Sequence, residues 1–455
     1  MKQFVVLSFS LLALLAGCSK INDSKAEASI EEQVETPVDN TVLIPNQDVE
    51  YGFLSSEAPD SLSGAEVENV GKVNTFAVSM AKQFLKTVAS NYVFSPVSLA
   101  YILGMLSDGA TGQTRDEICA VLGFGEDNQQ EINEFCRDLI VLSSRNTSET
   151  EVLELANTCV ADNHFPMKEE YRKDLHNYYD ALVRNLDFLE DDTVGYINKW
   201  AEDHTGGRIN KVVDEVNGVM CLVNGMYFKG LWSEPFGSVA QQEKFYKETG
   251  ETLKVSMMSN LCKAARYYKG NGFQVATMDY GTLGPSDYSM SVFLPDKPET
   301  INGIDRPGFY EGVTVATMLS RLDGETISKA ITSSEDAWVY IQLPKYEINT
   351  DKSVVYDFKT MGIKTMFNEF GANFSKITDE QIHVSDIKHV ASIKIDEKGT
   401  EAAVVSNADL SYATDDLVND VPPIIYFIAN HPFIFVISER TTGAILFMGC
   451  YREPI

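Results

Sequence analysis

Hydrophobic positions from about residue 73 onward alternate between helical and strand spacing. Phe76, Met80 and Phe84 recur at the spacing of one helix face. Ser95-Pro96 is typical of a helix start, because serine caps the first turn and proline suits the first helical position. Further helices are therefore predicted over residues 97–105 and, after a glycine-rich break, over 114–122.

Strands are predicted from apolar runs of strand length that stop at turn residues. Residues 153–161 and 220–227 look buried on both faces, whereas 288–294 and 337–343 alternate and end at prolines. Three closely spaced strands are expected at the C-terminus, over 424–427, 433–437 and 444–448. Helices and strands thus mix without a repeat or an internal linker, which predicts one large α+β domain over 73–455.

The segment 396–413 has the most informative alternation in the chain. At a strand's period of two, one face is free of charge: Thr400, Ala402, Val404, Ser406, Ala408, Leu410 and Tyr412. The other face carries Glu401, Ala403, Val405, Asn407, Asp409 and Ser411. Strand propensity is modest and Gly399 can act as a pivot, so we expect a segment that is a loop in one state and a half-buried strand in another. An ordinary edge strand is the alternative.

The N-terminus predicts an export signal. Lys2 precedes an apolar stretch over 4–15, which is too short to span a bilayer. The stretch ends in Leu-Ala-Gly before Cys18, which resembles a bacterial lipobox and implies cleavage of residues 1–17 and lipidation of Cys18; an ordinary signal peptide with an incidental cysteine is the alternative. We therefore expect an exported, membrane-anchored lipoprotein at the outer membrane, cell surface or extracellular space, with the periplasmic face as a further option.

Residues 18–72 are predicted to be a flexible tether. From residue 19 to 72 there are twelve acidic and three basic residues and no sustained hydrophobic period. The whole chain has a net charge of −29, which argues against nucleic acid or anionic lipid as its main partner.

Residue spacings give no sign of a cofactor or a metal. Six cysteines besides Cys18 lie within apolar runs, which favours buried free thiols over a disulfide framework. The histidines show no metal-ligand spacing, and there is no Gly-x-Ser-x-Gly elbow of a serine hydrolase. We expect no enzyme and no cofactor.

Six short sequence blocks occur in order over 73–455. The blocks are residues 91–99 with Phe-Ser-Pro, the Ile-Asn-x-Trp segment with Thr-Gly-Gly-Arg-Ile over 197–209, the strand 222–232 with Asn224 and Trp232, Leu-Pro-Lys-Tyr at 343–346, His-Pro-Phe at 431–433, and Leu-Phe-Met-Gly at 446–449. In their order and spacing they resemble the serpins, the serine protease inhibitors. The resemblance implies the serpin fold, with a large mixed sheet, a mobile reactive loop, further sheets and about eight to nine helices.

The resemblance also implies a mechanism and the residues that serve it. The loop offers a bait bond to a serine endopeptidase, and the acylated loop then inserts into the large sheet and traps the protease. The implied hinge is Glu397, Gly399, Thr400, Glu401, Ala402 and Ala403. The polar cluster under the sheet, the shutter, is Ser95, Ser98, Asn224 and His389; His389 has an ordinary core histidine as its equal alternative. Trp232 belongs to the breach, where insertion starts.

The bait bond is placed by counting from the hinge. Seventeen residues from Glu397 inclusive end at Ala413, so the bond is Ala413–Thr414, with Tyr412 as the alternative. Small Ala413 suits elastase-like proteases and Tyr412 chymotrypsin-like ones. The span from Glu397 to Pro432 is 35 residues, about eight more than is usual, which leaves the bond itself open. The alternative function is a non-inhibitory serpin that acts as a binding or chaperone lipoprotein; we expect a monomer in either case.

Overall fold

The computed structural model describes residues 2–10, 64–400 and 422–454, apart from 126–127, 146–149, 191, 205–206, 208–209, 217, 238–240, 282–286 and 297–313. In these regions the fold is α+β, with two large sheets and nine α-helices. None of the helices in the described part is long and apolar enough to cross a membrane.

The seven-stranded sheet, sheet A, carries the predicted site. Its strands are β1 (Lys2–Ser10), β3 (Glu151–Asp162), β4 (Ala181–Leu186), β5 (Met220–Leu231), β11 (Tyr346–Ser353), β12 (Ile382–Ile395) and β13 (Gly399–Thr400). Between β5 and β12 lie two other strands, β1 and β13. β5 and β12 are therefore far enough apart at the centre of sheet A to hold a further strand between them.

The nine-stranded sheet, sheet B, forms the other half of the molecule. Its strands are β2 (Tyr92–Phe94), β6 (Gln241–Tyr246), β7 (Thr252–Lys269), β8 (Phe273–Asp279), β9 (Tyr288–Pro295), β10 (Glu335–Pro344), β14 (Ile425–Ile428), β15 (Phe433–Glu439) and β16 (Ile445–Tyr451). Every residue of β9, β15 and β16 is buried, which fits their near-continuous apolar sequences.

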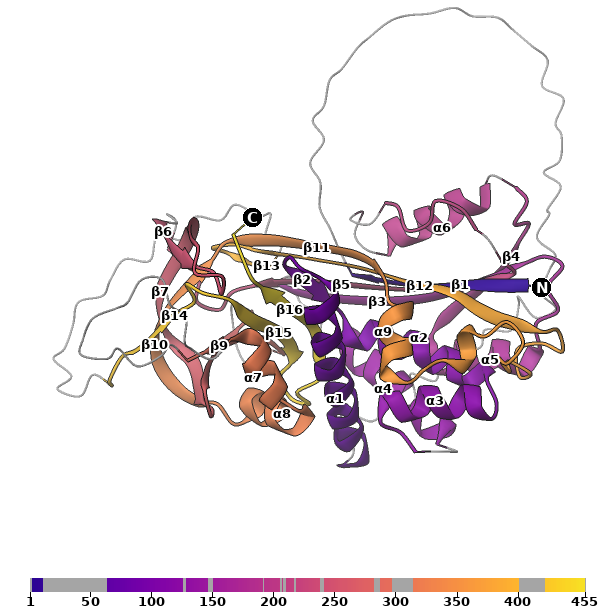
Figure 1. Ribbon diagram of the computed structural model, residues 1–455, viewed down its shortest axis with the longest axis horizontal. Coiled ribbons are helices and arrows are strands. Elements are labelled where there is room, and N and C mark those ends of the chain that lie inside the picture. The colour runs from indigo at the N-terminus through magenta and orange to yellow at the C-terminus, as the bar shows by residue number, and fades with distance from the viewer. Residues whose placement is uncertain are drawn as a thin grey trace, which may run out of the picture.

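The helices cover sheet A on both faces. They are α1 (Gly64–Thr87), α2 (Pro96–Gly109), α3 (Gln113–Leu122), α4 (Gln129–Arg145), α5 (Glu169–Tyr179), α6 (Asp192–Asp203), α7 (Val315–Arg321), α8 (Gly324–Thr332) and α9 (Val355–Met361). Figure 1 shows α6 alone on the upper face, with α2 to α5 below it and α7 and α8 under sheet B. The predicted helices over 97–105 and 114–122 are confirmed as α2 and α3.

Two N-terminal segments have a secondary structure that the sequence analysis did not predict, while the export signal itself stays a prediction. The last nine residues of the predicted tether, 64–72, form the first turns of α1, where Val67, Val70 and Val73 lie three residues apart and Val70 and Val73 are buried. Part of the predicted signal, Lys2–Ser10, is a strand in the chain that begins at Met1. Residues 11–63, with Cys18, lie outside the described residues.

The six cysteines of the globular body are buried thiols outside any disulfide, as their apolar surroundings predicted: Cys119, Cys136, Cys159, Cys221, Cys262 and Cys450. Burial raises the pKa of the Cys159 thiol to about 12, so at neutral pH this thiol is protonated and unreactive.

Candidate functional site: the insertion path in sheet A

The predicted hinge enters sheet A between β5 and β12. Gly399 pairs with Leu231, and Thr400 pairs with Gly230 on one side and Ile395 on the other, antiparallel to both strands. Thr400 is 2% exposed, so its side chain already lies on the buried face that the alternation predicted. The remaining hinge residues, Glu401, Ala402 and Ala403, lie outside the described residues.

Glycine is required at position 399 because the two backbones come very close. A Cβ atom there would clash with the carbonyl oxygen of Gly230 and lie 2.8 Å from the Cα of Leu231. A side chain at this position would therefore force the hinge away from β5.

Trp232 and Tyr280 hold the hinge at the top of the sheet. The Trp232 indole donates a 2.9 Å hydrogen bond to the carbonyl of Asp396, and its backbone N–H donates to the carbonyl of Lys398 at 2.8 Å. The Tyr280 ring stacks on Trp232 with centroids 4.5 Å apart, and the Tyr280 and Thr400 hydroxyls lie 2.7 Å apart. Trp232 therefore lies beside the hinge, its role in the breach stays a prediction, and Tyr280 is a partner that the sequence interpretation missed.

Glu397, in the predicted hinge, forms an ion pair with Lys345. Its Oε2 accepts from the Lys345 ammonium at 2.8 Å. Burial works to raise the pKa of Glu397, but the hydrogen bond from Lys345, a backbone hydrogen bond and the charge of Lys345 together hold that pKa below its usual value. Both groups are partly exposed, so the pair contributes little to stability and can open when the hinge moves.

Two predicted shutter residues, Ser95 and His389, are in contact under the sheet. The Ser95 backbone N–H donates to Nε2 of His389 at 3.2 Å, while the Ser95 hydroxyl accepts from the backbone N–H of Ser98 at 3.1 Å and caps α2. Burial, with a smaller effect from Lys352, lowers the pKa of His389 to about 3. The imidazole is therefore neutral, and its Nε2 accepts the hydrogen bond.

Asn224, the fourth shutter residue, has a different partner. Its amide donates to Oδ1 of Asn157 at 2.7 Å, and the Asn157 amide donates to the carbonyl of Tyr179 at 2.6 Å. Asn157 was missed, although an asparagine in a run predicted to be buried on both faces was a usable signal. The structure thus brings together Ser95, Ser98 and His389, and places Asn224 in a neighbouring hydrogen-bonded pair.

The polar chain continues below the sheet to an acidic group. The Tyr179 hydroxyl donates to Oδ1 of Asn133 at 2.7 Å, and the Asn133 amide donates to Oδ1 of Asp108 at 2.8 Å. Burial raises the pKa of Asp108 to about 6, against the effect of the Asn133 hydrogen bond.

The proposed bait-bond residues Tyr412, Ala413 and Thr414 lie outside the described residues, so the bond stays a prediction. The described residues contain no cluster of three His, Cys, Asp or Glu side chains that could hold a metal ion.

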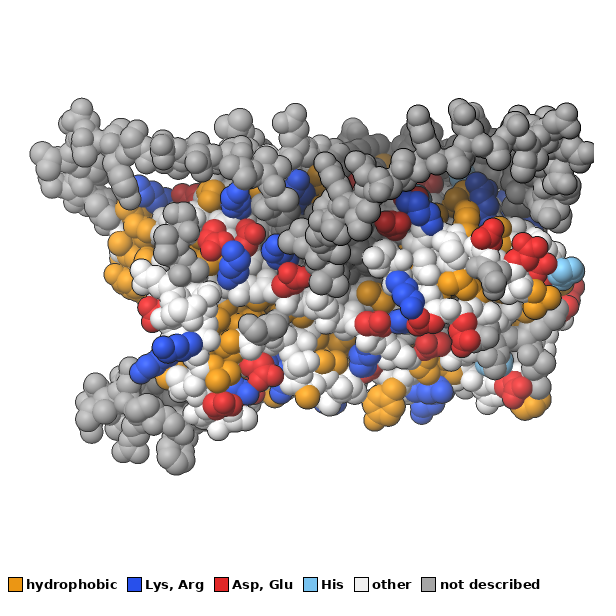
Figure 2. All heavy atoms as spheres, turned by 90° about the horizontal axis from the view of Figure 1, so that it is seen from above, with side chains coloured by type: hydrophobic (Ala, Val, Ile, Leu, Met, Phe, Trp, Pro, Cys, Tyr) orange, Lys and Arg blue, Asp and Glu red, His pale blue; other side chains and the backbone are white. Residues whose placement is uncertain are grey.

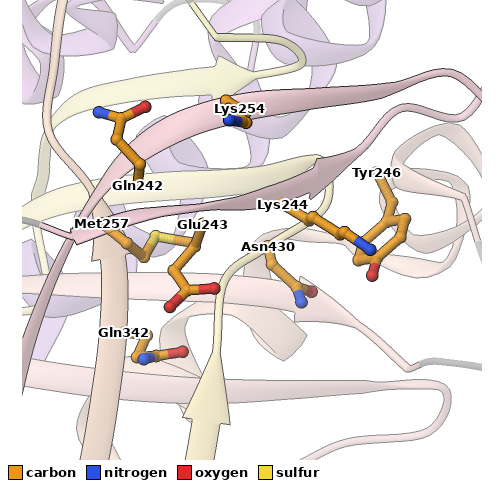
Figure 3. A pocket seen from close by; sticks show the side chains of 8 residues that line it. All are labelled: Gln242, Glu243, Lys244, Tyr246, Lys254, Met257, Gln342 and Asn430. Carbon is orange, nitrogen blue, oxygen red and sulfur yellow. The ribbon is translucent and has the colours of Figure 1, made fainter.

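A cavity of about 310 Å³ lies on sheet B, away from this path. It is lined by Gln242, Glu243, Lys244, Tyr246, Lys254, Met257, Gln342 and Asn430. In Figure 3 these side chains come from neighbouring strands and from the segment after β14, and their charges are mixed. The cavity is therefore separate from the hinge and the shutter.

Comparisons with known proteins identify the family. The serpin family pattern, described as serine protease inhibitor, matches residues 71–454. The chain is 28% identical to Serpin B10 of Rhinolophus ferrumequinum, covering 84% of this chain and 98% of that protein. It is 27% identical to an uncharacterized serpin-like protein of Methanosarcina mazei, covering 99% of this chain and 98% of that protein.

Solved structures give the same fold. Native tengpin, a thermophilic serpin, has a TM-score of 0.72 at 23% identity, covering 87% of this chain and 96% of tengpin. Human thyroxine-binding globulin in complex with thyroxine has a TM-score of 0.70 at 25% identity, covering 86% of this chain and 99% of that chain. The protein therefore belongs to the serpin family, which is described as a family of serine protease inhibitors.

Proposed function

We propose that this serpin is inhibitory and traps a serine endopeptidase as a covalent acyl complex by inserting its cut loop into sheet A. The observation that supports this most is the position of Gly399–Thr400, already paired with both β5 and β12. The loop continues from Thr400, so a strand that grows from it would extend between β5 and β12 into the place that β1 occupies in this structure.

The side-chain alternation keeps the desolvation cost of such insertion low. Thr400 is buried, and the residues that share its face down to Tyr412 carry no charge. A charge on that face would be desolvated without a partner, at a cost of several kcal/mol. About a dozen new ladder hydrogen bonds at roughly 0.5–1.5 kcal/mol each supply on the order of 10 kcal/mol for the capture.

The target we propose is an elastase-like protease that cuts Ala413–Thr414, with a chymotrypsin-like protease at Tyr412 as the alternative. Beyond Thr414 the next residue on the inserting face is Asp416, so a much later bond would bury a charge. No Lys or Arg lies between Ala402 and Val421, so trypsin-like proteases are expected to be poor partners.

Incubation with pancreatic elastase, followed by a denaturing gel, tests both the covalent trapping and the position of the bait bond. An SDS-stable complex and a released C-terminal fragment that begins at Thr414 are expected. A fragment that begins at Ala413 moves the bond to Tyr412, and one that begins after Asp416 refutes the assignment. Cleavage without any complex, by elastase and chymotrypsin alike, favours the non-inhibitory alternative, a binding or chaperone role of the kind that thyroxine-binding globulin illustrates.

We further propose that Cys18 carries the lipid that anchors the protein to a membrane, with the acidic segment after it as a spacer. Detergent phase partition of Cys18→Ala tests this. The parent is expected in the detergent phase and the variant in the aqueous phase; a variant that stays with the detergent contradicts the proposal.

A further inference from the structure

The outer face of β10 and β14 is aromatic where a solvent-facing sheet is usually polar. Along β10, Val339 and Ile341 point inward and are fully buried, so Tyr340 points outward. Tyr340 lies opposite Tyr426 in the register, with ring centroids 5.7 Å apart, and Tyr426 is 66% exposed. Together with Trp338 these residues form what we call the aromatic face.

Neighbouring groups extend this face. The ammonium of Lys263, on β7, lies 5.1 Å from the Trp338 ring centroid and fixes its orientation. The Gln342 amide donates to the Tyr340 hydroxyl at 3.4 Å, and Gln342 also lines the cavity of Figure 3. Figure 2 shows hydrophobic side chains gathered at the end of the molecule where β7, β10 and β14 lie, on the left. The face and the cavity are therefore continuous.

Such a face has the composition of a binding surface. Contiguous exposed aromatics on a soluble protein mark interaction sites, and Tyr and Trp are over-represented among the residues that dominate binding energies. The chain as a whole is strongly acidic, with a net charge of −29. The other strongly exposed aromatic side chains of the described residues, Tyr356 and Phe370, are not paired with another ring across neighbouring strands as Tyr340 and Tyr426 are.

The length of the loop determines which partner reaches this face. Strand β14 begins at Ile425, and residues 415–424 join it to the proposed bait bond. Ten residues span at most about 33 Å. A serine protease of about 230 residues is roughly 45 Å across. A protease bound at Ala413–Thr414 is therefore held against this end of the molecule before the loop is cut.

We propose that the aromatic face is a docking surface for the target protease, which it contacts in the encounter complex in addition to the loop. This inference rests on the proposed inhibitory function. The loop then supplies the bond that is cut, while Tyr340 and Tyr426 supply affinity outside the protease's substrate groove. Binding at this second surface raises the rate of capture without changing the insertion step.

The test compares Tyr340→Ala/Tyr426→Ala with a control of equal exposure. Tyr356, on α9 in the other half of the molecule (Figure 1), is 67% exposed, so Tyr356→Ala removes a similar side chain far from the face. Pancreatic elastase and chymotrypsin serve as probes. For each, the second-order rate of inhibition and the number of inhibitor molecules used per protease are measured, together with affinity for the protease whose catalytic serine is replaced by alanine.

For the protease that the parent inhibits faster, the double variant is expected to associate at least about tenfold more slowly and to bind the inert protease correspondingly more weakly, a change of about 1.4 kcal/mol. The inhibitor consumed per protease should stay at the parent value, and Tyr356→Ala should match the parent throughout. An unchanged melting temperature shows that the double variant is folded.

Three results overturn the proposal. Rates within twofold of the parent for both proteases show that the face is not used. A parent dimer that Tyr426→Ala dissociates in sedimentation shows that a second copy of the chain covers it. If the parent forms no covalent complex with either protease, the inhibitory function fails and this inference fails with it, whereas the first two results leave that function standing.

Discussion

The two sheets of this serpin are built from opposite kinds of centre. The middle of sheet B is mainly apolar: β9, β15 and β16 are buried throughout and carry Phe293, Phe435 and Ile445, and a buried hydroxyl such as that of Ser291 pairs within the sheet, with Thr277. The middle of sheet A holds Asn224 and His389, each hydrogen-bonded and each fully buried. Burial of apolar side chains stabilises a sheet without requiring precise geometry. Buried polar side chains stabilise it only while their hydrogen-bond partners stay aligned.

Under the proposed inhibitory mechanism, this difference predicts which sheet changes. Opening sheet A would exchange one set of hydrogen bonds for another, supplied by the entering loop. Opening sheet B would expose aromatic and aliphatic side chains to water at about 25 cal/mol per Å². The proposal therefore predicts that sheet B stays fixed and that sheet A accepts the strand.

The largest effect is expected from a charge at the start of the insertion path. Thr400→Arg places a guanidinium beside the buried Tyr280 hydroxyl, so insertion slows while acylation continues. The yield of covalent complex should fall by at least about tenfold as the protein becomes a substrate. Glu401→Arg, on the opposite face of the alternation, is the control and should keep the parent yield; wild-type yield for Thr400→Arg would refute the insertion path.

The next effect concerns the N-terminal strand. Residues 4–10 of β1 lie opposite 220–226 of β5, and extending the Thr400–Gly230 register antiparallel places residues 404–410 opposite the same positions. The two strands cannot both be present. Protein that retains residues 1–17 should therefore be cut without trapping more often than protein that lacks them, as densitometry of complex and cleaved bands will show. Equal partition of the two forms would mean that β1 does not obstruct the loop.

The two centres should also differ in how mutations act before and after loop cleavage. Ile437→Val in β15 should cost about 0.5–1.5 kcal/mol in both forms, because sheet B does not rearrange. Asn157→Ala leaves the Asn224 amide without its partner and should cost about 1–3 kcal/mol in the intact form, with a different cost after cleavage. Denaturant unfolding of intact and cut protein measures all four values. Equal costs for Asn157→Ala in both forms would show that this pair does not sense insertion.

The last effect is the pH dependence of the shutter. The pKa of His389 is lowered to about 3 in the folded protein, against a usual value of 6.5, so the unfolded chain binds the extra proton as the pH falls. The parent should lose up to about 1.4 kcal/mol per pH unit below about pH 6.5 from this group. His389→Asn should remove that loss. The difference in the free energy of unfolding between the parent and this variant should therefore narrow as the pH falls.

Asp108 acts in the opposite direction. Its pKa is raised to about 6, so the folded state gains stability as the pH falls through that value, and the parent alone would show a mixture of both effects. The comparison of parent and His389→Asn cancels this contribution, because both contain Asp108. A gap that stays constant from about pH 7 to pH 5 would mean that His389 titrates alike in the folded and unfolded chains.

The sequence alone predicted parts of both sheets and missed others. Apolar runs ending at turns predicted β9, β15 and β16 to within three residues, whereas β2, β6, β7 and β8 of sheet B were not predicted. Burial of Thr400 agrees with the alternation along its segment. The pairing of Asn157 with Asn224, and of Tyr280 with Thr400, joins residues far apart in the chain, and no local pattern encodes it.

The most direct test of insertion is the melting temperature of the protein before and after a single cut in its loop. Elastase cleaves the loop, mass spectrometry confirms that the rest of the chain is intact, and both forms are heated under the same conditions. Insertion should stabilise the cut form by on the order of 10 kcal/mol and raise its melting temperature by about 20 °C. A cut form that melts at or below the temperature of the intact protein would contradict insertion into sheet A.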